Sequence, residues 1–142
     1  MTLTFACEVL EPSGHGLDMG DLLFRTETTC VSSGELNPPQ HCMVYLACVL
    51  LLDAARTSLR HRKPATVVAT DSSFVIRLHP VSNKEFVLEA GRQRIGQFPG
   101  DEILSAIAAG VESLLRDHPL LDNDIAIGDL RAALRSAHEV LR

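Results

Sequence analysis

HCMVYLACVLLLDAA, residues 41–55, is the most apolar stretch of this chain, with no charged residue from Cys42 up to Asp53. Such a segment could cross a membrane, hold a metal ion or a disulfide through Cys42 and Cys48, or form the centre of a core. A membrane-spanning helix needs roughly 20 apolar residues. Only about half of that length precedes the charges of Asp53 and Arg56. We therefore predict a core helix that is apolar nearly all round because other elements cover it.

The flanking residues predict where this helix begins and ends. Asn37 can accept hydrogen bonds from the free amides of a first turn. Pro38 suits the first helical position, because its missing N–H is not needed there. A basic cluster suits the negative end of the helix dipole, and Pro64 follows it. We predict a helix over residues 38–60. The basic cluster consists of Arg56, Arg60, His61, Arg62 and Lys63.

The predicted helix also indicates on which face each of its side chains lies. Cys42 and Cys48 are six residues apart, which places them on different faces at 3.6 residues per turn. We therefore expect both to be small core residues that do not meet each other. Burying one leucine contributes about 1.5–3 kcal/mol before entropy. On this basis we expect a charge at Leu50 to unfold the domain.

Length and charge limit the class of protein. The chain has 142 residues, which predicts one domain over residues 1–142. Its net charge of −5 argues against nucleic-acid binding, which requires clustered Lys and Arg. Acidic residues are concentrated near the N-terminus, where Arg25 is the only Lys or Arg in residues 1–37. These acidic residues are Glu8, Glu11, Asp18, Asp21, Glu27 and Glu35.

The N-terminal sequence and the cysteines bear on location and cofactors. MTLTFACEVLEPSG lacks both the basic start and the long apolar run of a signal peptide, so we expect a cytoplasmic protein without membrane contact. The four cysteines have no metal-ligand spacing and no CxxC pair. We expect them to be reduced thiols, with no bound metal and no cofactor. They are Cys7, Cys30, Cys42 and Cys48.

Residue alternation predicts the strands. Residues 3–10 and 22–33 form the first two, separated by a Gly-rich loop. Residues 71–73, Asp-Ser-Ser, predict a turn within a second group, since such side chains bond to the local backbone. The strands of this second group are 65–70, 74–81, 85–91 and 92–98.

Two further helices complete the chain. Apolar stripes at helical spacing predict them over residues 99–119 and 128–142. The element order is therefore ββ–α–ββββ–αα, which indicates an α+β fold. We predict a single antiparallel sheet of about five to six strands, covered on one face by the central helix and the two C-terminal helices.

No motif for a known chemistry emerges from the sequence. The glycines of GHGLDMG, residues 14–20, do not open a helix after a strand, which excludes a dinucleotide-binding loop. His15 lies near Asp18 and Asp21, and these residue types can hold a metal ion. A solvated loop is the favoured interpretation, because no defined ligand set is present. His41, beside Gln40, is expected to be a partly exposed residue at the helix start.

A hydrolase site and a phosphate site are also conceivable from the residue types. Ser72 or Ser73 could act as a nucleophile with His79 as base, but His79 lies roughly 20 Å along the next strand, so a hairpin turn is favoured. The basic cluster could bind phosphate, but compensation of the helix dipole is favoured. A second basic stripe on the outer sheet face is expected to pair across strands. It comprises Arg77, Arg92 and Arg94, opposite Glu85 and Glu89.

The layout of residues 36–116 resembles that of small α+β proteins of high-GC bacteria. The resemblance is carried by MVYLACVLLLDAA, the hairpin TDSSFVIRLHP and the closing amphipathic helix. Some proteins of this kind are immunity proteins that neutralise polymorphic toxins. The resemblance implies a non-catalytic cytoplasmic protein that covers the active site of a toxin, and it assigns no site residues.

Three functions are compatible with the residues. The first is a non-catalytic binding protein, most concretely an immunity-type inhibitor, whose acidic surface meets a basic toxin domain. The second is an acidic secretion-type chaperone. The third is a small ligand-binding domain or enzyme with a pocket between the sheet and residues 38–60. A monomer and a homodimer are equally compatible with the sequence. The predicted partner-binding residues are Glu8, Glu11, Asp18, Asp21, Glu27 and Glu35.

Overall fold

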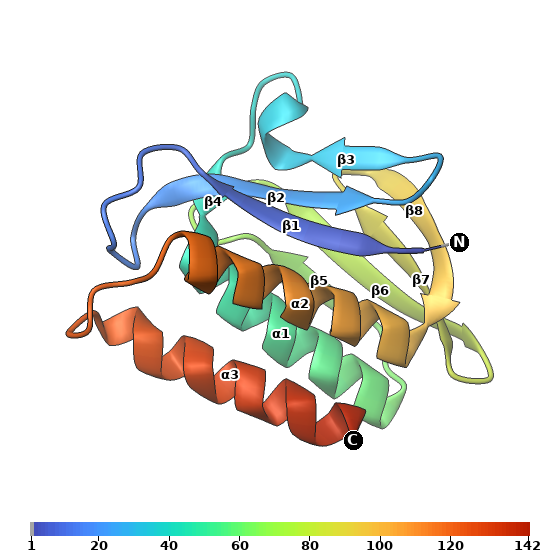
Figure 1. Cartoon of the computed structure of the whole chain (residues 1–142). Coiled ribbons are helices and arrows are strands. Elements are labelled where there is room, and N and C mark those ends of the chain that lie inside the picture. Colours follow the sequence, from blue (N-terminus) through green and yellow to red (C-terminus); the bar gives the residue numbers. More distant parts are fainter. Residues whose placement is uncertain (1) are drawn as a thin grey trace.

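The computed structural model describes residues 2–142 and places their eight strands in two antiparallel sheets of four (Figure 1). The predicted α+β class is confirmed, but a single sheet of five to six strands is not what forms. Sheet A holds β1 (Thr4–Val9), β2 (Met19–Arg25), β3 (Cys30–Ser32) and β4 (Cys42–Met43). Sheet B holds β5 (Ala65–Val68), β6 (Val75–Ser82), β7 (Glu85–Ala90) and β8 (Gln93–Pro99).

Sheet A is built around β2, which pairs with β1 on one side and with both β3 and β4 on the other. Phe5 lies opposite Phe24 in the ladder, and both side chains are buried. The prediction of one strand over residues 22–33 is wrong, because the chain turns at Thr26. The Thr26 hydroxyl accepts hydrogen bonds from the amides of Thr28 and Thr29, which ends β2 and starts a short turn before β3.

Sheet B is the four-stranded meander that the sequence predicted, in the order β5-β6-β7-β8. The predicted turn at residues 71–73 is also confirmed, since the Ser72 hydroxyl accepts from the amide of Phe74 and donates to the carbonyl of Gln40. Opposite charges lie next to each other on neighbouring strands of this sheet, where Glu89 is paired with Arg77 on one side and with Arg94 on the other. In the described chain, no ladder joins sheet B to sheet A.

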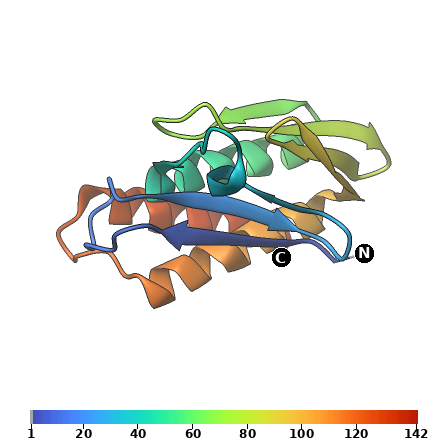
Figure 2. The same cartoon turned by 90° about the horizontal axis from the view of Figure 1, so that it is seen from above.

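The three helices lie together on one side of the two sheets (Figures 1 and 2). They are α1 (Val44–His61), α2 (Gly100–Asp117) and α3 (Ile125–Leu141). Helix α1 is central and contacts both sheets and both other helices. Helix α2 packs on β1 so closely that a Cβ at Gly110 would overlap the Phe5 carbonyl. No helix within residues 2–142 has the combined length and apolarity that a membrane crossing requires.

Helix α1 begins six residues later than predicted and ends where the basic cluster predicted. Asn37 and Pro38, joined by a cis peptide bond, lie in a loop rather than in a first turn. The reason is tertiary: the amide of Met43 donates to the carbonyl of Thr70, and β4 pairs with β2, which holds residues 42–43 extended. Helix α3 begins earlier than predicted, because Asp124 caps it by accepting from the amide of Ala126.

The core is continuous, and it includes Cys42 and Cys48 as predicted. Aliphatic side chains are the most numerous in it, but all five phenylalanines and Tyr45 are buried there as well. The prediction for Leu50 was wrong, because its side chain is 48% exposed, whereas Leu51 and Leu52 are fully buried. The reason is that α1 is covered by the sheets and the other helices on most of its surface, but not on the side that carries Leu50.

A thiol that the sequence did not connect with α1 lies against it. Cys7 of β1 places its Sγ 3.5 Å from the Sγ of Cys48. This hydrogen bond, together with burial, raises the pKa of Cys7 well above its ordinary value. Burial, reinforced by Cys48 and Asp21, raises the pKa of Cys42 to about 12. Burial is also the main cause that raises the pKa of Tyr45 to about 12, and the Tyr45 hydroxyl donates to the His118 carbonyl over 2.6 Å.

These three groups predict that the protein loses stability at alkaline pH. In the unfolded chain the thiols ionise from about pH 8.5 and the phenol from about pH 10, while in the folded protein all three keep their protons longer. Their contribution is therefore complete below about pH 8.5 and is lost as the pH rises toward 12. Each group removes about 1.4 kcal/mol per pH unit while only the unfolded form is ionised.

Urea unfolding at neutral pH and at about pH 10.5 measures this loss. Cys42→Ala is the matched variant, because it removes one of the three groups and should make the loss with pH smaller. An unfolding free energy that stays constant between the two pH values would contradict the prediction.

Candidate functional site

The six acidic residues predicted to bind a partner are spread over the length of sheet A rather than gathered in one patch. Glu8 is exposed on β1, Glu11 is exposed in the β1–β2 loop, and Glu27 is exposed at the opposite end, in the β2–β3 turn. Glu27 accepts from the amide of Thr2, which lowers the pKa of its carboxyl group. Glu35 is exposed in η1 (Ser33–Glu35), above β2 and β3 in Figure 1.

Asp21 is buried, so its carboxylate does not face a partner as the sequence had suggested. Only 4% of Asp21 is exposed. Its Oδ1 accepts from the Ser33 hydroxyl over 2.9 Å and lies 2.8 Å from Nδ1 of His41. The same Ser33 hydroxyl accepts from the amide of Leu22. These contacts fasten η1 and the loop before β4 onto the outer face of sheet A.

Asp21, Ser33 and His41 are the residue types of a catalytic triad, but their hydrogen bonds differ from those of a triad. In a triad the serine hydroxyl donates to the histidine, which the carboxylate orients from its other side. Here Ser33 donates to Asp21 instead, and Ser33 is fully buried, so no substrate carbonyl can reach its oxygen. The arrangement therefore secures a loop, and it does not supply an activated nucleophile.

The metal and hydrolase sites that the sequence allowed but did not favour are not assembled within residues 2–142. In this part of the chain no three His, Cys, Asp or Glu side chains converge as metal ligands. His15 Nδ1 lies 3.9 Å from Oδ2 of Asp124, and the His15 carbonyl accepts from the amide of Asp18. His79 lies opposite Val87 in sheet B, away from the turn that holds Ser72.

The cavity between α1 and sheet B is only about 10 Å³, far below the usual range of roughly 300–1,000 Å³ for ligand pockets. A more open hollow of about 380 Å³ lies beside the end of α1, where Thr57, His61 and Lys63 are among its lining residues.

Two loops that are distant in sequence meet at one end of the molecule, which we call the acidic end and define as residues 10–18 and 118–125. The amide of Gly16 donates to Oδ2 of Asp124, and the amide of Leu121 donates to the carbonyl of Gly14, each over 2.8–2.9 Å. A Cβ at Gly16 would lie 2.5 Å from the Cβ of Ala126. Glycine at position 16 thus permits the close contact between the loops.

The acidic end combines negative charge with exposed apolar side chains. Its two segments contain four acidic residues and no Lys or Arg. They also hold four of the seven large apolar side chains that are exposed in the described chain. The acidic residues are Glu11, Asp18, Asp122 and Asp124. The exposed apolar residues are Leu10 (49%), Leu17 (63%), Leu121 (48%) and Ile125 (94%).

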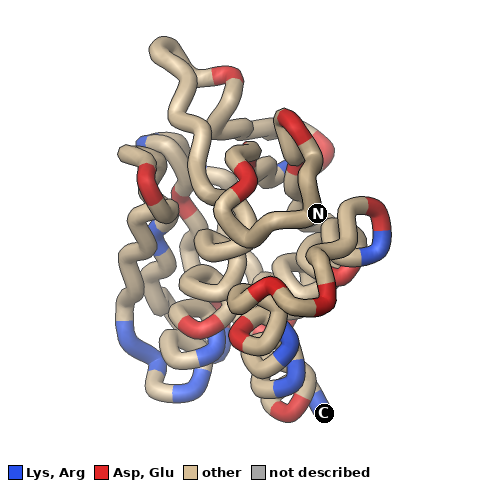
Figure 3. Tube along the Cα trace, turned by 90° about the vertical axis from the view of Figure 1, so that its left-hand side faces the viewer, with Lys and Arg blue, Asp and Glu red and all other residues tan. Residues whose placement is uncertain are grey.

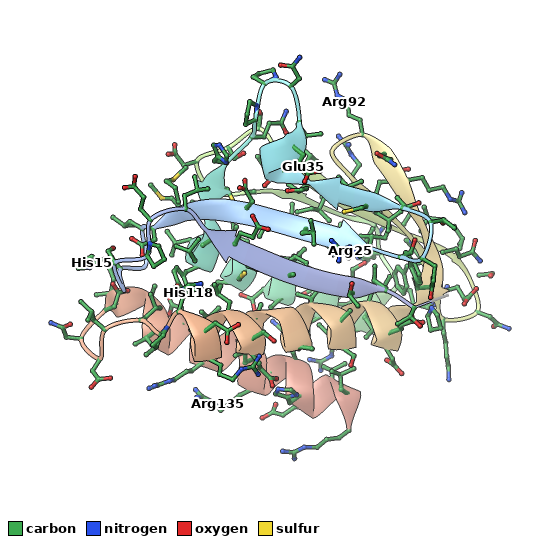
Figure 4. All side chains as sticks on the ribbon, turned by 45° about the horizontal axis from the view of Figure 1, so that its top comes forward. His15, Arg25, Glu35, Arg92, His118 and Arg135 are labelled. Atoms are coloured by element: carbon green, nitrogen blue, oxygen red, sulfur yellow. The ribbon has the colours of Figure 1, made fainter. Side chains whose placement is uncertain are left out.

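The acidic side chains at this end differ in their exposure and in their hydrogen-bond partners. Figure 3 looks onto it and shows Asp and Glu on the loops nearest the viewer. Asp18 is partly buried and holds the β1–β2 loop through the amide and hydroxyl of Ser13, which lower the pKa of Asp18 although its burial opposes them. Figure 4 shows His15 and His118 at the acidic end, with Arg25, Arg92 and Arg135 placed away from His15.

A cavity of about 430 Å³ lies where the two loops meet α1. Its walls include the apolar side chains of Leu17, Leu46 and Ile125, and its polar groups include Asp124 and His15. The side chain of Asp124 is 11% exposed, whereas that of His15 is 61% exposed. The cavity is therefore an apolar hollow with a carboxylate inside it and an imidazole at its rim.

Comparison with protein-family models, with curated proteins and with solved structures found no match for this chain. Function must therefore be argued from the site itself. Of the predicted residues, Glu11 and Asp18 belong to the acidic end. Sequence reasoning missed Asp122, Asp124 and Ile125, because they lie between the two helices predicted over residues 99–119 and 128–142. It missed Leu17 because the loop around it was expected only to be solvated.

Proposed function

We propose that this chain is a non-catalytic protein-binding module of the immunity type, which blocks a toxin or effector by covering a basic surface on it. The observation that carries the proposal is the acidic end, whose two segments expose Leu17, Leu121 and Ile125 and contain four carboxylates and no Lys or Arg. The four free thiols are compatible with a cytoplasmic location, where cysteines stay reduced.

The physical basis is that of a standard protein interface. Clustered exposed apolar side chains are uncommon on a protein that has no partner. Binding energy comes mainly from apolar anchors near the centre of an interface, while charges around them speed encounter and select the partner. At the acidic end Leu17 and Ile125 would be the anchors, and Glu11 and Asp122 would repel acidic proteins and attract basic ones.

The experiment uses the protein encoded beside this chain's gene as the candidate partner. The two proteins are co-expressed to measure rescue from toxicity, and their affinity is measured by calorimetry at low and high salt. We expect tight binding that weakens with salt. The double variant Leu17→Ser/Ile125→Ser should weaken binding at least about tenfold and abolish rescue.

Val81→Ser is the matched control, because Val81 is an exposed apolar residue of β6, outside the acidic end. It should leave affinity and rescue unchanged. Equal loss in both variants, or binding that neither variant alters, would count against the acidic end as the interface. If the partner stays active while it is bound, the chain is not an inhibitor, and that result would support the alternative function of a secretion-type chaperone.

A further inference from the structure

The cavity of the acidic end combines features that suit one kind of side chain, and this inference rests on the proposed function. Leu17, Leu46, Ile125 and Ala126 contribute apolar walls. The carboxylate of Asp124 lies inside, and each of its oxygens accepts only one backbone N–H, from Ala126 to Oδ1 and from Gly16 to Oδ2. A carboxylate has about four acceptor positions, so about two positions on Asp124 remain free for a donor. His15, at the rim, places its Nδ1 3.9 Å from Oδ2 of Asp124, which is beyond hydrogen-bond distance.

We propose that this cavity receives a lysine or arginine side chain from the partner protein. Such a side chain has an aliphatic stem and a cationic head, which match the apolar walls and the carboxylate respectively. The cavity of about 430 Å³ is large enough for one side chain of this size. The two loop segments that form it also carry Glu11, Asp18 and Asp122 and contain no Lys or Arg, which favours a cation. His15 is the one basic side chain in the lining, and it lies at the rim with 61% of its side chain exposed.

The position of Ile125 supports an external occupant. Ile125 is the first residue of α3 and is 94% exposed, although its neighbour Ala126 is buried in the core. An isoleucine at a helix start does nothing for the cap, which Asp124 provides. Together with Leu17, which is 63% exposed, it stands at the edge of the cavity, where the stem of an inserted side chain would cover both residues.

The test does not need the partner. The probe is n-butylguanidinium, which reproduces the arginine side chain, and 1-butanol is the neutral probe of similar length. Amide chemical shifts of the whole protein are followed by NMR during titration. The expected result is saturable shifts of Gly16, Leu17, Ile125 and Ala126 with butylguanidinium, at a Kd on the order of 1–10 mM, and much smaller shifts with butanol.

Asp124→Asn is the decisive variant, because asparagine is also a good helix N-cap and can still accept from the Ala126 amide. Its NH2 group cannot accept from the Gly16 amide as Oδ2 does, so hydrogen exchange of the Gly16 amide in the free variant checks that the two loops stay together. It should weaken butylguanidinium binding about tenfold or more. Asp122→Asn is the matched control: it removes the same charge from the same loop but from a residue outside the cavity lining, and it should change the affinity less than about twofold.

The possible results separate this inference from the proposed function. Absence of saturable shifts, equal response to both probes, or equal effects of the two variants would overturn the cationic pocket. If partner binding still depends on Leu17 and Ile125 in that case, the proposed function stands without the pocket. If butylguanidinium binds as expected but no partner depends on the acidic end, the pocket stands and the proposed function falls.

Discussion

Leu51→Glu is expected to unfold the protein, whereas Leu50→Glu, one residue earlier in the same helix, is expected to leave it folded. Leu51 is fully buried at the centre of α1, while Leu50 is 48% exposed. A glutamate at position 51 would lose the burial of a leucine and place a carboxylate in an aliphatic core without a partner. Losses of this kind exceed about 4–5 kcal/mol, which is comparable to the total stability of a typical domain, about 5–15 kcal/mol.

At position 50 the new carboxylate can point into water. The change then removes only the half of the leucine that is buried, so we expect a loss of about 1 kcal/mol. Circular dichroism during heating and urea titration measures both variants. Unfolding of Leu50→Glu would mean that this side of α1 is covered in the protein, by a second copy or by a segment packed on it, and would contradict the exposure described above.

Asp21→Ala is expected to destabilise the protein by about 2–3 kcal/mol, because it leaves two groups without a partner. Ser33 is fully buried and would lose the acceptor of its hydroxyl proton, and His41 would lose the carboxylate 2.8 Å from its Nδ1. The loop above is also shaped around this carboxylate, since a Cβ at Gly34 would lie 2.5 Å from Oδ2 of Asp21.

Glu8→Ala provides the comparison, because Glu8 is the register partner of Asp21 on the same face of sheet A but is exposed. We expect it to change the unfolding free energy by less than about 0.5 kcal/mol. Urea unfolding gives both values, and hydrogen exchange shows whether residues 33–41 loosen in Asp21→Ala. Equal effects at the two positions would show that Asp21 is not the anchor of this loop.

The buried position of Asp21 changes how the acidity of the N-terminal third should be understood. One of its six carboxylates stabilises the fold, and Asp18 is largely engaged with Ser13 in its own loop. Glu27 lies at the opposite end of sheet A from the β1–β2 loop. The negative charge gathered at the acidic end therefore comes partly from Asp122 and Asp124, which are more than 100 residues from Glu11 in sequence.

Much of the fold followed from local patterns. The uncharged run before Asp53 predicted the central helix, and its basic end predicted where that helix stops. The hairpin at Ser72 and the meander of sheet B were predicted because alternation and turn residues act over a few positions. The apolar stripe of α2 also predicted a helix, because an amphipathic helix buries its apolar side whatever element it packs against.

The start of α1, the division into two sheets, the burial of Asp21 and the formation of the acidic end were decided only by tertiary structure. Each depends on contacts between distant segments, such as the Met43 amide with the Thr70 carbonyl and the Gly16 amide with Asp124, 108 residues away. Such contacts produce no periodic pattern of residues in the sequence. The sequence by itself therefore determined the three helices and most strands, because that choice rests on short-range spacing. Packing alone determined the short strand β4, the break between β2 and β3, and which carboxylates are buried and which stay exposed.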